Sequence, residues 1–555
     1  MKATDCGFIT RQELVSMIPP IFLDIKPDDL VLDMCAAPGS KTSQIVEFLA
    51  AMGEKKGKLT EGVVLANEVD FKRAYILSHQ LKRLNSPNMA IINHAAQFLP
   101  TLYSDSIKDP DHKIYFDKLL VDVPCSGDGA LRKLPNRWRN WSANDAIHLH
   151  KLQVQILARA VKLAKEGGLI VYSTCSLNAI ENEAVVAEII SRANNTSKGA
   201  LELIDVNDRL EGFKMRRGFN KWKFLLPKRK KDQESGENED KHIKEENEAQ
   251  NNGEKDEVLF DTFETYDEFF NVYKNHPKLS KSVTKGMFSD NPESLKNDVH
   301  LDRTGRIMPH DNNSGGFYVA LIKKNAHVQL ATEQPEHKSK EEVTEENKII
   351  EKVEAEVEPG FKQATHKLAK EQDLAVVNTI EQPIIDNLKK EYGLTDDFPF
   401  DQLIMSSNPS KRIQLISKNL KKLIDSDVKK LINYVYLGTS VFVRNKTGED
   451  FWRLSQNGIH LVKPYMTKKI VDINVEFFKY LIQIPQSLPF NNFEKRFEAE
   501  RKTLEALENG CYCFCYKEYE EELLSVIKMP YSIVLMVSKE DVAGLKMKYI
   551  EESAS

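Results

Sequence analysis

The chain has 555 residues, of which 41% are hydrophobic and 29% are charged, so it is long enough for two or three domains and at least one large core. Its formal net charge of −5 excludes a uniformly basic nucleic-acid binder, although acidic and basic stretches are segregated along the sequence. The seven cysteines lack dense spacing, and there is no apolar leader and no run of about 18 apolar residues. These features predict a soluble intracellular protein in a reducing compartment.

The first 326 residues alternate between short apolar runs and amphipathic stretches. Residues 10–18 predict a short helix, with Thr10 and Glu13 at capping-box spacing and Pro19-Pro20 ending it. Strands are expected at residues 30–34, 63–66, 89–92, 118–121 and 169–174, with a late strand at 315–322. Helices are expected after the turn at residues 35–42, through residue 51, and at residues 71–84, 148–164 and 180–193. Such alternation is typical of an α/β fold with a doubly wound, mostly parallel sheet.

Two polar, acidic stretches lack apolar periodicity and are expected to be disordered. The first is an insertion at about residues 228–257, and the second lies within a linker at residues 327–373. Residues 374–555 then form a smaller mixed α/β segment, with strands expected at residues 441–443 and 532–537. We therefore expect one domain over residues 1–326 and a second over residues 374–555.

Residues 31–42 combine a strand, an acidic residue and a tight glycine-containing turn that opens a helix, which suits a cofactor whose polar end meets backbone N–H groups. A phosphate-binding P-loop is excluded because Ser40 and Cys35 stand where that motif needs glycine. A dinucleotide fingerprint is excluded for want of three spaced glycines. Glu68 follows the next strand, where such folds place a carboxylate on ribose hydroxyls; the alternative is a solvated loop acid.

Two cysteines, Cys125 and Cys175, lie just beyond two predicted strands, and Asp122 ends the first of these. Ligands and reacting groups gather at this edge of an open α/β sheet, although an isolated Cys175 would be a buried structural thiol. No CxxC or Cys/His cluster indicates zinc, and a reducing compartment disfavours a disulfide. Three further cysteines alternate along a predicted strand and are expected to pack on one side of it: Cys511, Cys513 and Cys515.

Residues 32–42, 122–127 and 172–178, in this order, resemble the motifs of the NOL1/NOP2/Sun family of RNA (cytosine-5) methyltransferases. Within that family the sequence is most similar to the eukaryotic tRNA methyltransferase 4 / Sun-domain member 2 branch. The resemblance implies a Rossmann-like methyltransferase core, S-adenosylmethionine as cofactor and tRNA as substrate. It also implies that the C-terminal segment is a PUA-like RNA-binding module.

The resemblance implies a role for each residue of the motifs. Cys175 is the nucleophile that adds to carbon 6 of cytosine, Asp122 hydrogen-bonds the base edge, and Cys125 helps to break the adduct after methylation. Lys41 favours the thiolate or orients the base. The cofactor is held by Glu68 on its ribose, by Asp122 near the methyl-donor end, and by the turn Cys35, Ala36, Ala37, Pro38, Gly39, Ser40 and Lys41.

The sequence departs from the family in two places. The run Asn93-His94-Ala95-Ala96 has Ala95 where the family has an aspartate that contacts the adenine amino group; one lost hydrogen bond costs about 1–3 kcal/mol. The sequence also starts almost at the first motif, whereas relatives carry an RNA-contacting segment before it. Either the sequence is incomplete, or the C-terminal segment and a set of basic residues bind RNA.

The basic residues are interleaved with Trp138 and Trp141, which favours RNA contact over a solvated face. They are Lys72, Arg73, Arg132, Lys133, Arg137 and Arg139. The cluster of residues 228–231 is typical of a nuclear localisation signal and predicts the nucleus, including the nucleolus, as the compartment. We expect a monomer that binds tRNA and no membrane. The rival hypotheses are a catalytically weak RNA-binding paralogue, and a methyltransferase acting on ribosomal or messenger RNA.

Overall fold

The computed structural model describes residues 11–56, 59–102, 113–134, 136–227, 260–290, 299–328, 330, 377–406, 412–427, 431–445, 451–484, 486–517 and 521–550. The chain divides into two compact units, one formed by Met1–Leu120 with Ala364–Ser555 and the other by Val121–Gln363.

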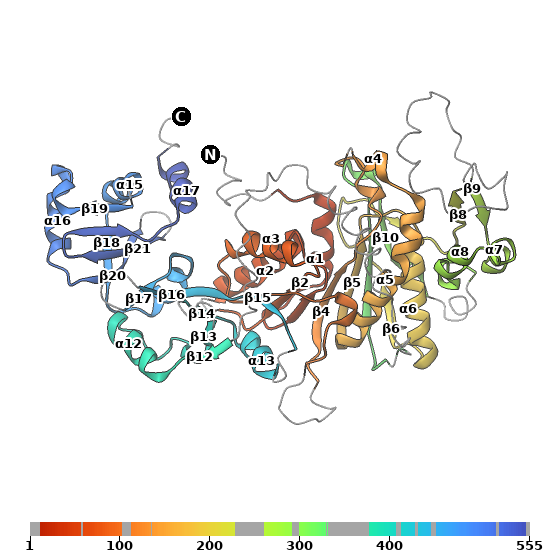
Figure 1. Ribbon diagram of the computed structural model, residues 1–555, viewed down its shortest axis with the longest axis horizontal. Helices are drawn as coiled ribbons and strands as arrows, with labels where there is room; N and C mark the ends of the chain where they lie inside the picture. The colour runs from red at the N-terminus through yellow and green to blue at the C-terminus, as the bar shows by residue number, and fades with distance from the viewer. Residues whose placement is uncertain are drawn as a thin grey trace. The chain divides into compact units, whose positions relative to one another are not determined.

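The first unit contains the parallel strands expected from the sequence, in the order β3-β2-β1-β4. Their bounds are β1 (Leu30–Asp33), β2 (Val63–Asn67), β3 (Met89–Ile92) and β4 (Phe116–Asp122), and the crossovers contain helices α2 (Ser40–Lys56) and α3 (Phe71–Lys82) (Figure 1). The side chains of β2 and β3 are all buried, as parallel strands covered on both faces require. The doubly wound α/β prediction is confirmed here.

The prediction for the N-terminal helix is wrong in one respect. Pro19 and Pro20 do not end a helix; they occupy the first turn of α1 (Ile18–Phe22), which a 3-10 turn at Leu14–Met17 precedes. Proline is tolerated in a first helical turn because the backbone N–H groups there have no partner within the helix. Thr10 lies outside the described residues.

The C-terminal part of the first unit extends the sheet at its edge. Strand β15 (Tyr434–Leu437) pairs antiparallel with β3, and the backbone N–H of Gly438 donates to the Met89 carbonyl at 2.8 Å. The same region contains helices α12 (Gln382–Tyr392), α13 (Lys418–Ser426) and α14 (Ile459–Val462). Five of its strands form a separate sheet: β12 (Val377–Thr379), β13 (Leu403–Ser406), β14 (Arg412–Leu415), β16 (Thr439–Asn445) and β17 (Phe451–Leu454).

A further sheet in this part, ordered β18-β20-β21-β22-β19, carries the three alternating cysteines. Cys511, Cys513 and Cys515 lie on β20 and are buried in one hydrophobic cluster, which confirms their predicted packing role. The elements are β18 (Ile470–Ile473), α15 (Val475–Gln483), β19 (Ser487–Pro489), α16 (Glu498–Glu505), β20 (Gly510–Lys517), β21 (Glu521–Met529), β22 (Ser532–Leu535) and α17 (Lys539–Tyr549) (Figure 1).

The second unit is built on β5 (Ala164–Thr174) and β11 (Phe317–Lys324), which pair antiparallel over six residue pairs. The late strand therefore returns to the sheet as expected. Helices α5 (Ala143–Leu163) and α6 (Glu183–Thr196) lie side by side in this unit (Figure 1). The remaining elements are α4 (Arg137–Asn140), β6 (Leu201–Ile204), β7 (Arg216–Arg217), β10 (Gly305–Ile307) and α10 (Pro309–Asn312).

A small aromatic cluster completes the second unit, built from β8 (Phe224–Pro227), β9 (Phe260–Phe263), α7 (Tyr266–Tyr273) and α8 (Pro277–Ser282). The two acidic stretches fall almost wholly outside the described residues, and so does the basic cluster at residues 228–231. None of the helices in the described part of the chain is both long and apolar enough to cross a membrane.

Candidate active site

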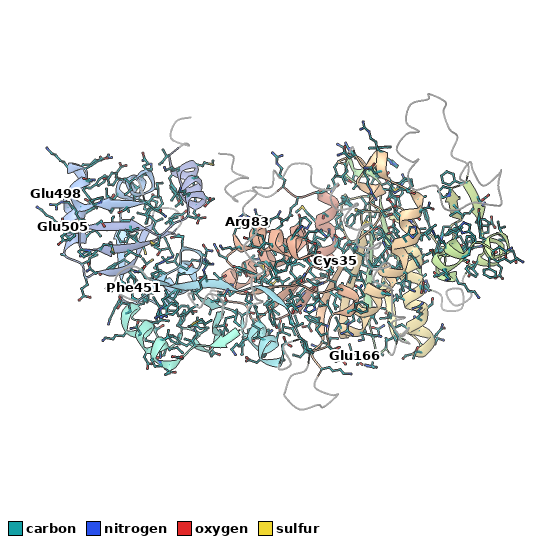
Figure 2. The ribbon with its side chains drawn as sticks, viewed as in Figure 1. Cys35, Arg83, Glu166, Phe451, Glu498 and Glu505 are labelled. Atoms are coloured by element: carbon teal, nitrogen blue, oxygen red, sulfur yellow. The ribbon has the colours of Figure 1, made fainter. Side chains whose placement is uncertain are left out.

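In the first unit, the turn after β1 is tied to the start of α2. The Thr42 hydroxyl donates to Asp33 Oδ2 at 2.7 Å, so the acid at the strand end fixes the first turn of the helix. Cys35, labelled in Figure 2, lies in this turn. Gly39 has φ +110°, which favours glycine, and a Cβ there would lie 2.8 Å from Leu77 Cδ1. The predicted cofactor turn is therefore a tight loop in front of a long helix.

The segment before β1 also holds this turn. The Gln12 amide donates to the Ser40 carbonyl at 2.9 Å and to Ser43 Oγ at 3.1 Å. The Lys41 ammonium is nearly buried and donates to Ser16 Oγ at 2.7 Å. Both contacts are local to this unit, and they fix the position from which Lys41 extends.

Glu68 sits just after β2, and its residue is 3% exposed. Its Oε1 accepts from the backbone N–H of Asp70 at 3.0 Å, and its Oε2 lies 3.4 Å from Arg73 Nη1. Burial raises the pKa of the Glu68 carboxyl, and the charge of Arg73 partly offsets this. The Glu68 carboxylate is thus held in one orientation. Its burial is not that of a solvated loop acid, which was the alternative interpretation of this residue.

The loop after β3 contains the departure from the family pattern. The Asn93 side chain donates to the Glu68 and Val69 carbonyls, each at 2.8 Å. His94 Nε2 accepts from the backbone N–H of Asn433 at 2.9 Å, and burial lowers the pKa of His94. Ala95 adds no hydrogen-bonding side chain to this loop.

In the second unit, two sulfur atoms meet where two strands end. Cys125 Sγ and Cys175 Sγ are 3.3 Å apart, and the two thiols are not bonded to each other. Cys175 directly follows β5, as predicted. The hydrogen bond to Cys175, followed by burial, raises the pKa of Cys125 well above its ordinary value. The raised pKa favours the protonated form of Cys125, and either sulfur atom can be the donor of the contact between them.

The last residue of β4 lies in the same unit as the thiols. Asp122 Oδ1 accepts from the Ser173 hydroxyl at 2.7 Å, and the backbone N–H of Val123 donates to the Ser173 carbonyl at 3.2 Å. The loops that carry Cys125 and Cys175 are joined further on by the backbone N–H of Gly129, which donates to the Cys175 carbonyl at 2.9 Å. The structure therefore brings together three of the predicted catalytic residues.

One residue predicted as an RNA contact has a different role. Arg137 is 1% exposed, and its Nε and Nη2 donate to the Ser126 carbonyl at 2.8 and 2.5 Å. Its Nη2 also lies 3.3 Å from Asp145 Oδ2. A buried guanidinium bound in this way cannot reach RNA, so this part of the surface prediction is wrong. Trp138, by contrast, is exposed.

Several buried polar residues of this unit were not assigned roles from the sequence. Glu181 and Gln153 hydrogen-bond the Cys125 loop, and Asp128 Oδ1 accepts from the backbone N–H of Leu177 at 2.6 Å. Burial raises the pKa of Asp128 and of Glu181. For Asp128 and Glu181 the available signal was their position inside or just after the two thiol motifs, whereas Gln153 lies on α5, away from both motifs in the sequence. Among the described residues, no cluster of three or more His, Cys, Asp or Glu side chains could hold a metal ion.

The chain matches two family models. Residues 20–233 match the model of the 16S rRNA methyltransferase RsmB/F, and residues 374–467 match the model of the NSUN2 Pre-PUA domain. The chain is 33% identical over 526 residues to the multisite-specific tRNA:(cytosine-C(5))-methyltransferase trm4b of Schizosaccharomyces pombe, covering 87% of this chain and 70% of that protein. The chain belongs to the NOL1/NOP2/Sun family of RNA cytosine-5 methyltransferases.

Two other members of the family support the same assignment. The multisite-specific tRNA:(cytosine-C(5))-methyltransferase of Saccharomyces cerevisiae is 33% identical over 556 residues, covering 96% of this chain and 72% of that protein. The tRNA (cytosine(34)-C(5))-methyltransferase of Drosophila melanogaster is 40% identical over 322 residues, covering 58% of this chain and 37% of that protein.

Members of this family use S-adenosylmethionine, and the first unit contains residues that suit its binding. The fixed Glu68 carboxylate suits a ribose diol, because each hydroxyl can donate to a carboxylate oxygen. The turn at residues 35–39 leads into the N-terminus of a 17-residue helix, where backbone N–H groups point outward. The residues present therefore fit this cofactor.

Proposed function

We propose that this protein transfers a methyl group from S-adenosylmethionine to carbon 5 of cytosine in tRNA. The observation that carries the proposal is the pair of sulfur atoms, 3.3 Å apart, in the loops after β4 and β5. The printed names of the S. pombe, S. cerevisiae and D. melanogaster relatives support tRNA as the substrate. The target base must leave its stack to reach such a site.

We assign the nucleophile to Cys175. Carbon 5 of cytosine is a weak nucleophile, and addition of a thiolate to carbon 6 moves electron density to carbon 5 and N3. When bound, S-adenosylmethionine supplies the methyl group as an electrophile. Asp122 would hydrogen-bond the base edge and stabilise the charge that develops at N3. The Asp122 carboxylate is held for this task by Ser173.

Cys125 then releases the product. Cys125 Sγ lies 3.3 Å from Cys175 Sγ, so a Cys125 thiolate, formed by loss of its proton to solvent, would be placed to act as the base in this step. The Cys125 thiolate takes the proton from carbon 5, and the C5–H electron pair re-forms the C5–C6 double bond. The Cys175 sulfur leaves as a thiolate, and the original protonation of the pair is restored.

The remaining predicted site residues keep their proposed roles. Glu68 would bind the ribose, and the turn that ends at Lys41 would bind the rest of the cofactor. Lys41 would favour the thiolate or orient the base, since a nearby cation lowers the pKa of a thiol. We propose that residues 374–555 form a PUA-like RNA-binding domain, that the protein is a monomer, and that it works in the nucleus or nucleolus.

The test is a methylation assay on an unmethylated tRNA transcript. Cys175→Ala should abolish incorporation of methyl groups from labelled S-adenosylmethionine, because carbon 5 then lacks the thiolate adduct that activates it, while tRNA binding in a filter assay stays within about twofold. Mapping of 5-methylcytosine in the wild-type product would identify the position. Methylation of ribosomal or messenger RNA but not of tRNA, or substantial activity of Cys175→Ala, would contradict the proposal.

A further inference from the structure

A fully buried carboxylate lies between the two thiol loops. Glu181 is 0% exposed and comes from the loop before α6. Its Oε1 accepts from the backbone N–H of Ser126 at 2.8 Å and from Gln153 Nε2 at 3.1 Å. Its Oε2 accepts from the hydroxyls of Ser126 and Ser176 at 2.5 and 2.6 Å.

The two serines occupy equivalent places in the two motifs. Ser126 follows Cys125 and Ser176 follows Cys175, and both hydroxyls donate to the same oxygen of Glu181. The hydroxyl oxygens of the two serines are themselves 3.3 Å apart. Each thiol is thus one residue away from a hydrogen bond to a shared acceptor.

The rest of both loops is held just as firmly. Arg137 donates twice to the Ser126 carbonyl, and Gln153 Nε2 also donates to the Pro124 carbonyl at 2.8 Å. On the other side, Asn182 Nδ2 donates to the Ser176 carbonyl at 2.8 Å. The backbone around both cysteines therefore has little freedom to adjust if the central carboxylate is removed.

Burial of a carboxylate costs several kcal/mol, and a well-packed apolar side chain in its place often leaves the protein equally stable. A buried carboxylate is therefore not explained by stability alone. At Glu181 the cost is met by four hydrogen bonds, all from the two thiol loops or from Gln153, which also contacts the Cys125 loop. Because all four bonds come from the loops that carry the two sulfur atoms or from a residue that contacts one of them, we connect the buried carboxylate with the geometry of those sulfur atoms.

We propose that Glu181 is a positioning residue for the reaction: through Ser126 and Ser176 it sets the distance and orientation of the Cys125 and Cys175 sulfur atoms. The inference rests on the proposed roles of the two thiols. It predicts that the two serines affect different steps. Ser176 positions Cys175, which forms the adduct, and Ser126 positions Cys125, which breaks it.

A second consequence concerns the charge of Glu181. After the hydrogen bond to Cys175, burial and the Cys175 charge, the negative charge of Glu181 and then that of Asp122 also raise the pKa of Cys125. A neutral glutamine in place of Glu181 removes the Glu181 contribution. The pH dependence of adduct release should therefore move to lower pH in Glu181→Gln, a change that a purely structural role would not produce.

The test measures adduct formation and adduct release separately, under single-turnover conditions, with an unmethylated tRNA transcript and S-adenosylmethionine. Adduct is the protein–RNA species that survives on a denaturing gel, and release is its decay into free methylated RNA. Ser176→Ala should slow adduct formation about 10-fold or more, and Ser126→Ala should slow release about 10-fold while changing formation less than twofold. These sizes correspond to loss of one hydrogen bond to a charged group.

The matched control is Ser191→Ala on α6, because Ser191 is 1% exposed, close to the 0% of Ser126 and Ser176, and its hydroxyl makes no hydrogen bond within the described residues. It should change neither rate. If a serine variant unfolds, Glu181→Gln replaces it: both rates should fall, with the release profile moved to lower pH, at a melting temperature close to that of the wild type.

Equal effects of Ser126→Ala and Ser176→Ala on both steps, or wild-type rates in Glu181→Gln, would overturn the inference while leaving the proposed function intact. Failure of the wild-type protein to form any adduct with tRNA would instead overturn the proposed function, and the positioning role with it.

Discussion

At the scale of single residues, the backbone of Gly129 controls how closely the thiol loops approach. A Cβ at this position would lie 2.5 Å from the Gly316 carbonyl oxygen and 2.7 Å from the Cys175 carbonyl oxygen. Both contacts are with backbone atoms, so a side chain can be accommodated only if the backbone at Gly129, Gly316 or Cys175 shifts. The close approach explains why the second motif needs a glycine here.

We expect Gly129→Ala to slow adduct formation at least 10-fold and to lower the free energy of unfolding by about 1–3 kcal/mol, as overpacked sites do. Gly199→Ala is the control. Gly199 has φ +74°, a backbone conformation that disfavours a side chain, but no atom lies within 4 Å of a Cβ added there. The control should lose about 1–2 kcal/mol and keep wild-type adduct formation. Equal activity of both variants would contradict this account.

The site residues that the sequence predicted are those that follow strands. Cys175 and Asp122 could be placed because an apolar run and its last residue are visible in the sequence. Glu181 and Arg137 could not, because charged side chains are expected at the surface. Their burial depends on partners brought together only by the fold, as the Arg137 contacts to Ser126 show.

At the scale of elements, Lys324 links the end of β11 to the end of α5. Its ammonium donates to the carbonyls of Val161 at 2.9 Å and Ala164 at 2.6 Å, in the last turn of the helix. Free carbonyls at a helix C-terminus favour such a cation. Burial lowers the pKa of Lys324 to about 8.

The lowered pKa predicts a pH dependence of stability. Between about pH 8 and pH 10.5 the unfolded chain holds the Lys324 proton more tightly than the folded protein, so the free energy of unfolding rises with pH in that window. Lys324→Met should lose this rise and should lower stability at pH 7 by about 1–3 kcal/mol, because two carbonyls lose their donor. Denaturant unfolding at pH 7 and at pH 10 measures both effects. An unchanged difference between the two pH values would contradict the assignment.

The element boundaries show where periodicity is insufficient. Helix α5 begins at Ala143, about five residues before the predicted start, because Ser142 and Asp145 form a capping box that the apolar pattern does not reveal. Helix α1 begins at Ile18, since its prolines are compatible with a first turn. Strands β1 to β3 matched to within a residue, because buried parallel strands form continuous apolar runs.

At the scale of the whole molecule, the main surprise is that the sheet of the first unit receives a strand from the C-terminal part. Strand β15 pairs with β3, and the backbone N–H of Asn93 donates to the Asn433 carbonyl at 3.0 Å. This pairing covers strand β3, whose following loop begins at Asn93 and is hydrogen-bonded to the Glu68 carbonyl. No local pattern could predict it, because the partners are more than 300 positions apart.

Gly438 provides a test of that pairing. It has φ +48°, and a Cβ there would lie 2.3 Å from the Leu415 carbonyl oxygen. We expect Gly438→Ala to displace β15 and to lower the hydrogen-exchange protection of β3, at Met89–Ile92. Protection of β20 (Gly510–Lys517) provides the internal control and should be unchanged. Full protection of β3 in the variant would show that its edge does not depend on β15.

The central claim is that Cys175 forms the bond to cytosine and Cys125 breaks it. The most direct measurement is mass spectrometry of Cys125→Ala after reaction with an unmethylated tRNA transcript and S-adenosylmethionine. We predict a denaturation-resistant adduct in which a methylated cytidine nucleotide is attached to the peptide that contains Cys175. Free RNA alone, or attachment to any other residue, would contradict the account.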